Sequence, residues 1–122
     1  MKIENIKFKA KRLDGKGWAI GDLLHSYENG AIIVPIEGGG AFSVDPSTIC
    51  QFTGLKDCKG NEVWKGDIIK NPYLGKECSI TWNNHLCCFS ALCEINNAQH
   101  SLGTLIGSLG WYVVGNKFDK EK

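Results

Sequence analysis

The residues of this chain that could carry metal or thiol chemistry are its six cysteines and three histidines. The cysteines are Cys50, Cys58, Cys78, Cys87, Cys88 and Cys93. Zinc ligands usually come in pairs two to four residues apart. No Cys-x-x-Cys pair occurs, and His25, His85 and His100 have no short spacing. We therefore expect no metal site and no cofactor, and we interpret the cysteines as small core residues and surface thiols.

The number of cysteines would also allow disulfides. However, the chain opens on Met1-Lys2-Ile3-Glu4 and continues in alternating polar sequence, without the apolar segment of an export signal. Cytosolic thiols stay reduced. We therefore expect a cytoplasmic protein with free thiols, and no association with a membrane.

A hydrolytic site would need a nucleophile, a base and a group that orients the base. Ser43, Asp45, Ser47 and Thr48 are close in sequence, but no histidine and no Gly-x-Ser-x-Gly motif accompany them. The triplet Gly38–Gly40 lacks the Lys-Ser/Thr pair of a phosphate-binding loop. We expect that the protein is not an enzyme and has no catalytic residues.

Nucleic-acid binding is the alternative function. Five cations within ten residues accompany one acid, Asp14. They are Lys7, Lys9, Lys11, Arg12 and Lys16. The three lysines alternate along one predicted strand and could face phosphates together. Lysines on a strand also prevent pairing between sheet edges, and the net charge is only +1.

The elements that must position these residues are predicted to be strands. Ile6, Phe8 and Ala10 alternate with the lysines, as in a half-buried strand. Residues 18–27 and 31–34 are predicted to pair through an Asn29-Gly30 turn. Gly38–Gly40 is the expected hinge between two halves.

The second half is predicted to form a small barrel, because short strands and turn residues alternate. The predicted strands are residues 62–71, 77–82, 86–93, 104–105 and 112–116. Residues 46–51 could form one helical turn, and residues 92–102 are predicted to be a loop or a short helix. Trp64 and Trp82 are expected to be buried together with Ile68, Ile69 and Ile80.

One dense motif runs from Val44 to Lys70. Asp45-Pro46 predicts a capped helical turn. Asp57 and Gly60 are the first and fourth residues of a predicted type I turn. The residues that we assign a structural role in the motif are Asp45, Pro46, Gln51, Thr53, Gly54, Asp57, Gly60, Trp64, Gly66 and Asp67.

This motif resembles the pattern V-D-P-x-T-[IV]-x-Q-[FY]-T-G-L-x-D-x-x-G-x-E-[IV]-[YW]-x-G-D-[IV]-[IV] of YopX-like proteins, which phages and prophages encode. Residues 6–11, 18–24, 80–82 and 113–116 resemble further parts of the family pattern, although Lys11 stands where the family has an aromatic residue. The residues predict an all-β protein with an N-terminal β-hairpin subdomain (residues 1–44) and a small barrel (residues 45–122), and the resemblance implies that this barrel is SH3-like. It implies no activity.

We therefore expect a phage-encoded accessory protein that binds a macromolecule and does no catalysis. The expected partner is an unidentified phage or host protein, with nucleic acid as the alternative. Self-association would cover exposed strand edges, so a homo-oligomer also stays open.

Overall fold

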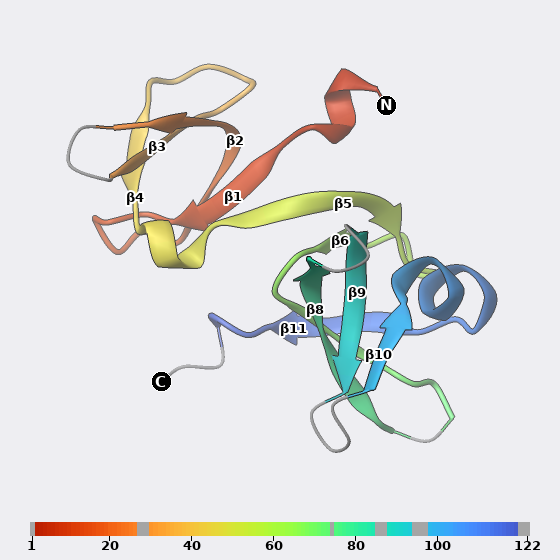
Figure 1. Ribbon diagram of the computed structural model, residues 1–122. Helices are drawn as coiled ribbons and strands as arrows, with labels where there is room; N and C mark the ends of the chain where they lie inside the picture. Colours follow the sequence, from red (N-terminus) through yellow and green to blue (C-terminus); the bar gives the residue numbers. More distant parts are fainter. Residues whose placement is uncertain (1, 27–29, 74, 85–87, 94–97, 120–122) are drawn as a thin grey trace. The chain divides into compact units, whose positions relative to one another are not determined.

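The computed structural model describes residues 2–26, 30–73, 75–84, 88–93 and 98–119. They form antiparallel strands with only brief helical turns, which confirms the all-β prediction (Figure 1). In the described part of the chain, no helix is both long enough and apolar enough to cross a membrane. The predicted Asn29-Gly30 turn falls partly on residues 27–29, which lie outside the described residues.

By its internal contacts the chain divides into two compact units, Met1–Phe52 (unit 1) and Thr53–Lys122 (unit 2). Strand β5 (Cys50–Lys56) contributes residues to both. We expected residues 1–44 and 45–122 to be separate domains, that is, parts that fold independently. Compact units do not test independent folding, so this stays a prediction.

Unit 1 is built on one curled sheet with strand order β4-β3-β2-β1-β5. Its strands before β5 are β1 (Phe8–Lys11), β2 (Trp18–His25), β3 (Ala31–Val34) and β4 (Phe42–Val44). The predicted alternation holds, since Ala10 lies opposite Ala19 in the core while Lys9 lies opposite Ile20 on the other face. The buried core consists of Ala10, Ala19, Ala31, Ile33 and Val44.

The sheet of unit 1 curls until β4 meets the residues that follow β1. Arg12 and Val44 form an antiparallel bridge. On either side of it, Leu13 N–H donates to the Ser43 carbonyl at 3.0 Å, and Asp45 N–H donates to the Lys11 carbonyl at 2.9 Å. The curl therefore encloses the core from several sides.

A 3₁₀ turn, η3 (Pro46–Thr48), leads from β4 into β5, as the Asp45-Pro46 pair predicted. The Asp45 carboxylate accepts a hydrogen bond from Ser47 N–H at 3.0 Å. Thr48 Oγ1 accepts one from Lys11 N–H at 2.8 Å and donates to the Asp45 carbonyl at 2.7 Å. The cap thus holds the turn and also joins it to β1.

Unit 2 contains a sheet with strand order β10-β9-β8-β7-β11. These strands are β7 (Asp67–Lys70), β8 (Glu77–Asn83), β9 (Cys88–Cys93), β10 (Ala98–Ser101) and β11 (Tyr112–Asn116). Strand β6 (Glu62–Trp64) lies next to β5 in the other sheet. In the described pairings this sheet does not close on itself, because β10 and β11 are its two edge strands and do not pair with each other. Its core includes Val63, Ile69, Cys78, Ile80, Ala91 and Trp111.

Two secondary-structure predictions for this unit are wrong. Residues 98–101, expected in a loop or short helix, form β10. Residues 104–105, expected in a strand, belong to the helical turn η4 (Thr104–Ser108). Leu102, Leu105 and Ile106 are all buried in the core, while Gly103 and Gly107 are exposed. Buried residues three and four positions apart are typical of a helix. The apolar run is too short for its sequence to distinguish a helix from a strand.

The predicted aromatic core is half right. Trp64 is buried, and Ile69 and Ile80 share one core cluster. Trp82, however, is 43% exposed, because it lies near the end of β8, two residues beyond Ile80. Its ring meets Phe89 edge-on, with centroids 5.1 Å apart. Ile68 is buried but lies outside that cluster, since adjacent strand residues point to opposite faces.

Candidate functional surface

The motif carboxylate of Asp57 is a hydrogen-bond hub in unit 2. Its oxygens accept from the N–H groups of Lys59 at 3.0 Å and Asn61 at 2.8 Å, as the predicted turn requires. Gly60 N–H closes the turn on the Asp57 carbonyl at 3.0 Å, and Gly60 has a φ of 83°. A further donor is Val113 N–H of β11, at 2.9 Å. The turn is thereby bound to a strand 56 residues away.

Asp67 makes a second link to β11. It is 2% exposed, and its two oxygens accept from Trp64 N–H at 2.8 Å and from the Asn116 side-chain amide at 3.0 Å. The preceding Gly66 is buried, with a φ of 94°. Its N–H donates to the Ile80 carbonyl at 2.8 Å, and its carbonyl accepts from Lys117 N–H at 2.9 Å. This turn therefore contacts β8 and the end of β11.

Most of the remaining motif residues also serve the backbone. Thr53 Oγ1 donates to the Val63 carbonyl at 2.6 Å and accepts from Leu55 N–H at 3.2 Å, so it joins β5 to β6. Gly54 has a φ of 86°, a conformation in the left-handed region that side chains disfavour. Gln51 is exposed on β5, opposite Phe8. Ser47 Oγ also donates to the Asp45 carboxylate, at 2.8 Å, within the exposed cap of η3. The motif thus gathers mainly groups that hold turns.

The pKa of Asp57 reflects its hydrogen bonds. Burial alone raises the pKa of this carboxyl group, because it disfavours the charged form. The hydrogen bonds from Val113, Asn61 and Lys59 stabilise the carboxylate and outweigh burial, so its pKa lies below the ordinary value of 3.8. Asp57 is therefore held as a carboxylate at neutral pH, and it is not poised to exchange protons.

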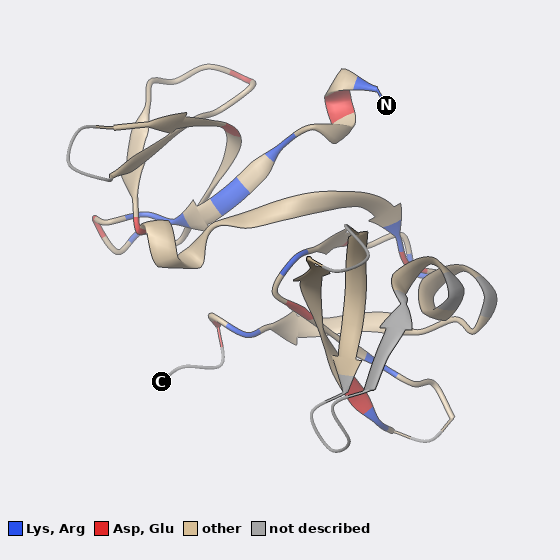
Figure 2. Ribbon diagram, in the orientation of Figure 1, with Lys and Arg blue, Asp and Glu red and all other residues tan. Residues whose placement is uncertain are grey.

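The five predicted cations do not form one exposed row. Figure 2 shows Lys and Arg following one another along β1. The ammonium groups of three of them lie over aromatic rings: Lys9 and Lys11 Nζ are each 4.8 Å from the Trp18 centroid, and Lys7 Nζ is 4.7 Å from that of Phe52. Such cation–π contacts hold each ammonium group against a ring and leave its charge in place. The three lysines are half-buried, and Lys16 is exposed.

Arg12 has different contacts from the lysines. Its guanidinium lies 4.0 Å from the Phe42 ring centroid and pairs with the Asp14 carboxylate. The pKa of Asp14 is lowered, first by the backbone hydrogen bond from Lys16 and also by Arg12. Asp14 thus offsets part of the local positive charge. What the structure gathers on one face is the pair Lys9 and Lys11, with Trp18.

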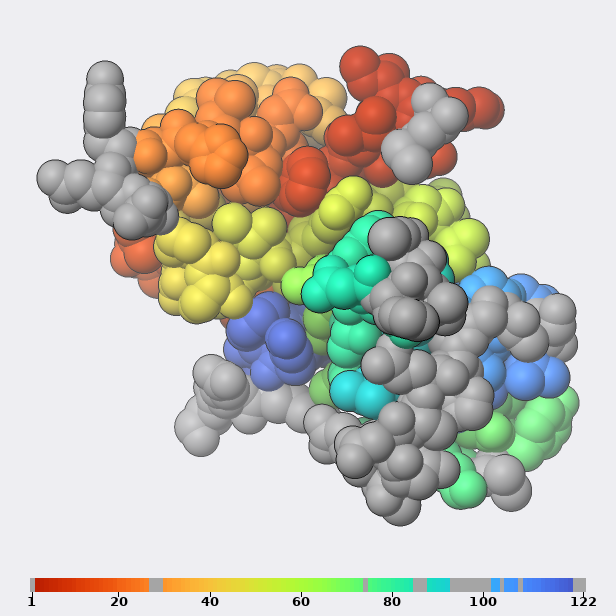
Figure 3. Space-filling view, in the orientation of Figure 1, coloured from red at the N-terminus to blue at the C-terminus, as the bar shows by residue number. Residues whose placement is uncertain are grey.

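The same face continues into apolar residues that sequence reasoning missed. On β2, Ile20 is 47% and Leu24 52% exposed, and the β1–β2 register places Ile20 opposite Lys9. Ile32 of β3 lies opposite Leu24, and Val34 lies opposite Asp22. Figure 3 shows β2 and β3 residues (orange) at the surface of unit 1. We call Ile20, Asp22, Leu24, Ile32 and Val34 the outer face. Its signal in the sequence is that β2 carries apolar residues at both odd and even positions.

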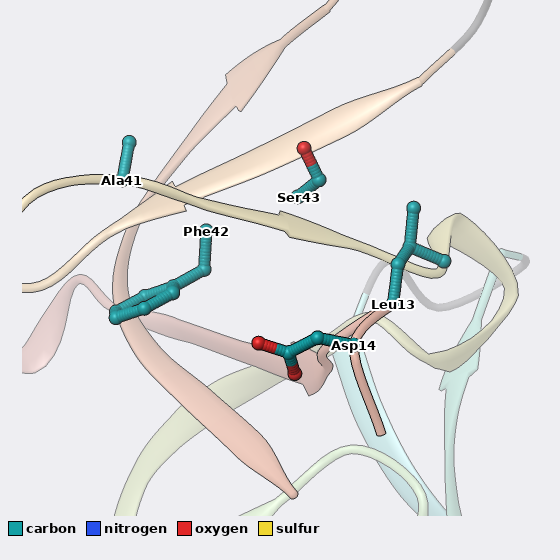
Figure 4. A pocket seen from close by; sticks show the side chains of 5 residues that line it. All are labelled: Leu13, Asp14, Ala41, Phe42 and Ser43. Carbon is teal, nitrogen blue, oxygen red and sulfur yellow. The ribbon is translucent and has the colours of Figure 1, made fainter. Parts of the chain in front are cut away.

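A shallow pocket of about 390 Å³ lies in unit 1 between β4 and the turn after β1 (Figure 4). It is lined by Leu13, Asp14, Ala41, Phe42 and Ser43. Its one ionisable lining group, Asp14, already pairs with Arg12. The pocket therefore presents one carboxylate beside apolar carbon, with no second group for acid–base chemistry.

Among the described cysteines, Cys78 departs from the predicted role. Cys50, Cys58 and Cys88 are not in disulfides, and Cys50 is buried, as a small core residue would be, with its Sγ donating to the Thr48 carbonyl at 3.3 Å. Cys78, in contrast, is disulfide-bonded, so the expectation of free thiols throughout is wrong. Among the described residues no three His, Cys, Asp or Glu side chains come together as metal ligands.

Comparison with known proteins assigns most of the chain to one family. A family model described as "YopX protein" matches residues 7–121. No curated protein matches the sequence. The match covers both units, from just before β1 to the residues after β11.

Proposed function

Because the chain belongs to the YopX family, we propose that it is a phage-associated accessory protein that binds another protein and performs no catalysis. The observation that carries this proposal is the outer face of unit 1. Two large aliphatic side chains, Ile20 and Leu24, stand about half exposed on one strand, beside Ile32 and Val34. Exposed aliphatic side chains gathered on one sheet face, here around the single carboxylate of Asp22, are typical of a protein-interaction site.

The hydrogen bonding of the motif supports a role without catalysis. Asp57 and Asp67 are the buried carboxylates of the motif, and both accept hydrogen bonds from the backbone of their own turns. A general base must reach the proton that it removes. These two carboxylates instead hold the fold together.

Nucleic-acid binding is the second candidate, and the pair Lys9 and Lys11 favours it. Both lysines share a face with Trp18, and lysine next to an aromatic ring can contact phosphate and base together. However, both lysine ammonium groups lie over that ring, so a base could stack there only by displacing one of them. The aliphatic outer face beside them offers a nucleic acid nothing to pair with. The protein partner is therefore the better fit.

The experiment is affinity capture of the tagged protein from host cells during phage induction. The double variant Ile20→Ser/Leu24→Ser should lose the partner that the wild type retains. Ile36→Ser is the matched control, since Ile36 is 63% exposed in unit 1 but lies outside β2 and β3. Equal capture by wild type and double variant would contradict the outer face as the binding site. Partner loss in the control as well would show that solubility, and not this face, governs capture.

A further inference from the structure

The outer face of unit 1 carries one ionisable side chain, Asp22, among aliphatic residues. Asp22 is exposed and lies on β2 between Ile20 and Leu24, which point the same way because strand residues two apart share a face. Their Cα atoms lie about 7 Å from that of Asp22, at about 3.3 Å per residue. Val34 of β3 stands directly opposite Asp22, with a Cα separation of about 4.5–5.5 Å. The carboxylate therefore has aliphatic neighbours on three sides.

The fold leaves this carboxylate available to a partner. In the described part of the chain, no ion pair and no side-chain hydrogen bond involves Asp22, whereas Asp14 pairs with Arg12. The preceding Gly21 is buried, and a Cβ at this position would lie 2.2 Å from the Val34 carbonyl oxygen. Strand β3 thus packs closely against β2 at this point, so Asp22 and Val34 are held side by side.

A partner that covers the outer face must supply a positive charge for Asp22. When apolar side chains of a partner cover Ile20 and Leu24, water is removed from the carboxylate between them as well, and a charge buried without a counter-charge is costly. An arginine meets this need. Its planar guanidinium donates two hydrogen bonds to one carboxylate and is weakly hydrated, and its methylene stem can lie along aliphatic side chains.

We propose that the outer face binds a segment of a partner protein in which an arginine stands between aliphatic residues. The guanidinium pairs with Asp22, and the flanking residues pack on Ile20 and Leu24. This inference rests on the proposed function, because it states the chemistry of the partner bound at the same face. The aliphatic residues supply contact area, whereas Asp22 selects the partner and fixes its position. A nucleic acid, whose backbone is anionic, offers Asp22 no such group.

Selection from a random library of short displayed peptides tests this chemistry with the full-length protein as bait. Parallel selections use Asp22→Asn and a matched control, Glu37→Gln, since Glu37 is an exposed carboxylate of unit 1 outside β2 and β3. Wild type and control should enrich peptides with an arginine between aliphatic residues, and Asp22→Asn should not. Enrichment of peptides without arginine, equal enrichment on Asp22→Asn, or no enrichment on the wild type overturns the proposal.

The affinity of one selected peptide then measures the pairing itself. Asp22→Asn should weaken its binding by about 10- to 100-fold, the range expected for hydrogen bonds between charged groups, and Glu37→Gln should leave it unchanged. Citrulline in place of the peptide's arginine keeps the shape and removes the charge. This change should weaken binding to the wild type by a similar factor and have little effect on binding to Asp22→Asn. An equal loss on both proteins overturns the pairing.

Affinity capture separates this inference from the proposed function. If Ile20→Ser/Leu24→Ser loses the captured partner while Asp22→Asn retains it in full, the outer face binds a protein without the Asp22 pair. The proposed function then stands, and the arginine inference fails. If the double variant also retains the partner, both fail.

Discussion

Asp67 accepts a hydrogen bond from the side-chain amide of Asn116 at 3.0 Å, and this contact joins the first residue of β7 to the last residue of β11. Both side chains are buried, so water cannot replace either partner. Asp57 makes the equivalent link to Val113, three residues earlier on β11. The two motif turns therefore hold the same strand at two points.

Asp67→Ala should lower the free energy of unfolding by roughly 2–5 kcal/mol, because two buried donors each lose an acceptor. The measurement is chemical denaturation, with the midpoint shifted and the slope unchanged. Asp22→Ala, on the exposed outer face, is the control and should cost no more than about 0.5 kcal/mol. A cost for Asp67→Ala as small as that of the control would contradict a stabilising role for the Asp67 hydrogen bonds.

Trp64→Ala and Trp82→Ala should differ clearly. Trp64 is buried, so truncation to Ala should cost roughly 3–5 kcal/mol. Trp82 is 43% exposed and its specific contact is the edge-on ring of Phe89, so its loss should cost about 1 kcal/mol. Denaturation midpoints of the two variants, measured side by side, decide the ranking. A denaturation midpoint unchanged by Trp64→Ala would show that the motif does not lie at the centre of the fold.

Asp57 should make unit 2 sensitive to acid. Its pKa is lowered in the folded protein, so its stabilisation is complete above the unfolded value, taken as 3.8, and is lost as pH falls through the folded pKa. The difference in unfolding free energy between wild type and Asp57→Asn should therefore be largest at neutral pH and shrink below about pH 4. Unfolding curves from pH 7 to acid measure it. A difference that grows in acid would contradict the sign of the shift.

The lysines of β1 separate the two candidate functions. If they bind phosphate, DNA affinity should fall steeply as salt rises, and Lys7→Glu/Lys9→Glu/Lys11→Glu should abolish it. We expect negligible DNA binding near physiological salt, because the net charge is +1 and Asp14 offsets Arg12. Fluorescence anisotropy with a labelled duplex and a labelled single strand is the measurement. Tight binding at physiological salt that the triple variant loses would favour a nucleic-acid partner.

Local chemistry was predictable from the sequence, and distant contacts were not. The Asp45 cap and the Asp57–Gly60 turn involve atoms within four residues, so residue type alone indicated them. Strand β3 ends where expected, just before Pro35. The links from Asp57 to Val113 and from Asp67 to Asn116 span 56 and 49 residues, and no local pattern encodes such pairs.

The candidate surface was predicted only in part. Alternation along β1 placed Lys9 and Lys11 on one face, but it gave no sign that their ammonium groups lie over Trp18. The outer face was missed because Ile20 and Leu24 look like core residues until the register of β2 and β3 shows which face is enclosed. Cys78 was misjudged because a disulfide depends on which residues the fold brings together and not on their spacing in the sequence.

The double attachment of β11 has a consequence for synthesis of the protein. A ribosome releases the motif turns around Asp57 and Asp67 well before it releases Val113 and Asn116. Until those last residues emerge, both carboxylates lack a partner that the finished protein provides. A nascent chain, or one ended early by a stop codon before Tyr112, would therefore carry a complete motif without a complete unit 2. Such truncated products should be recognised by proteases as unfinished.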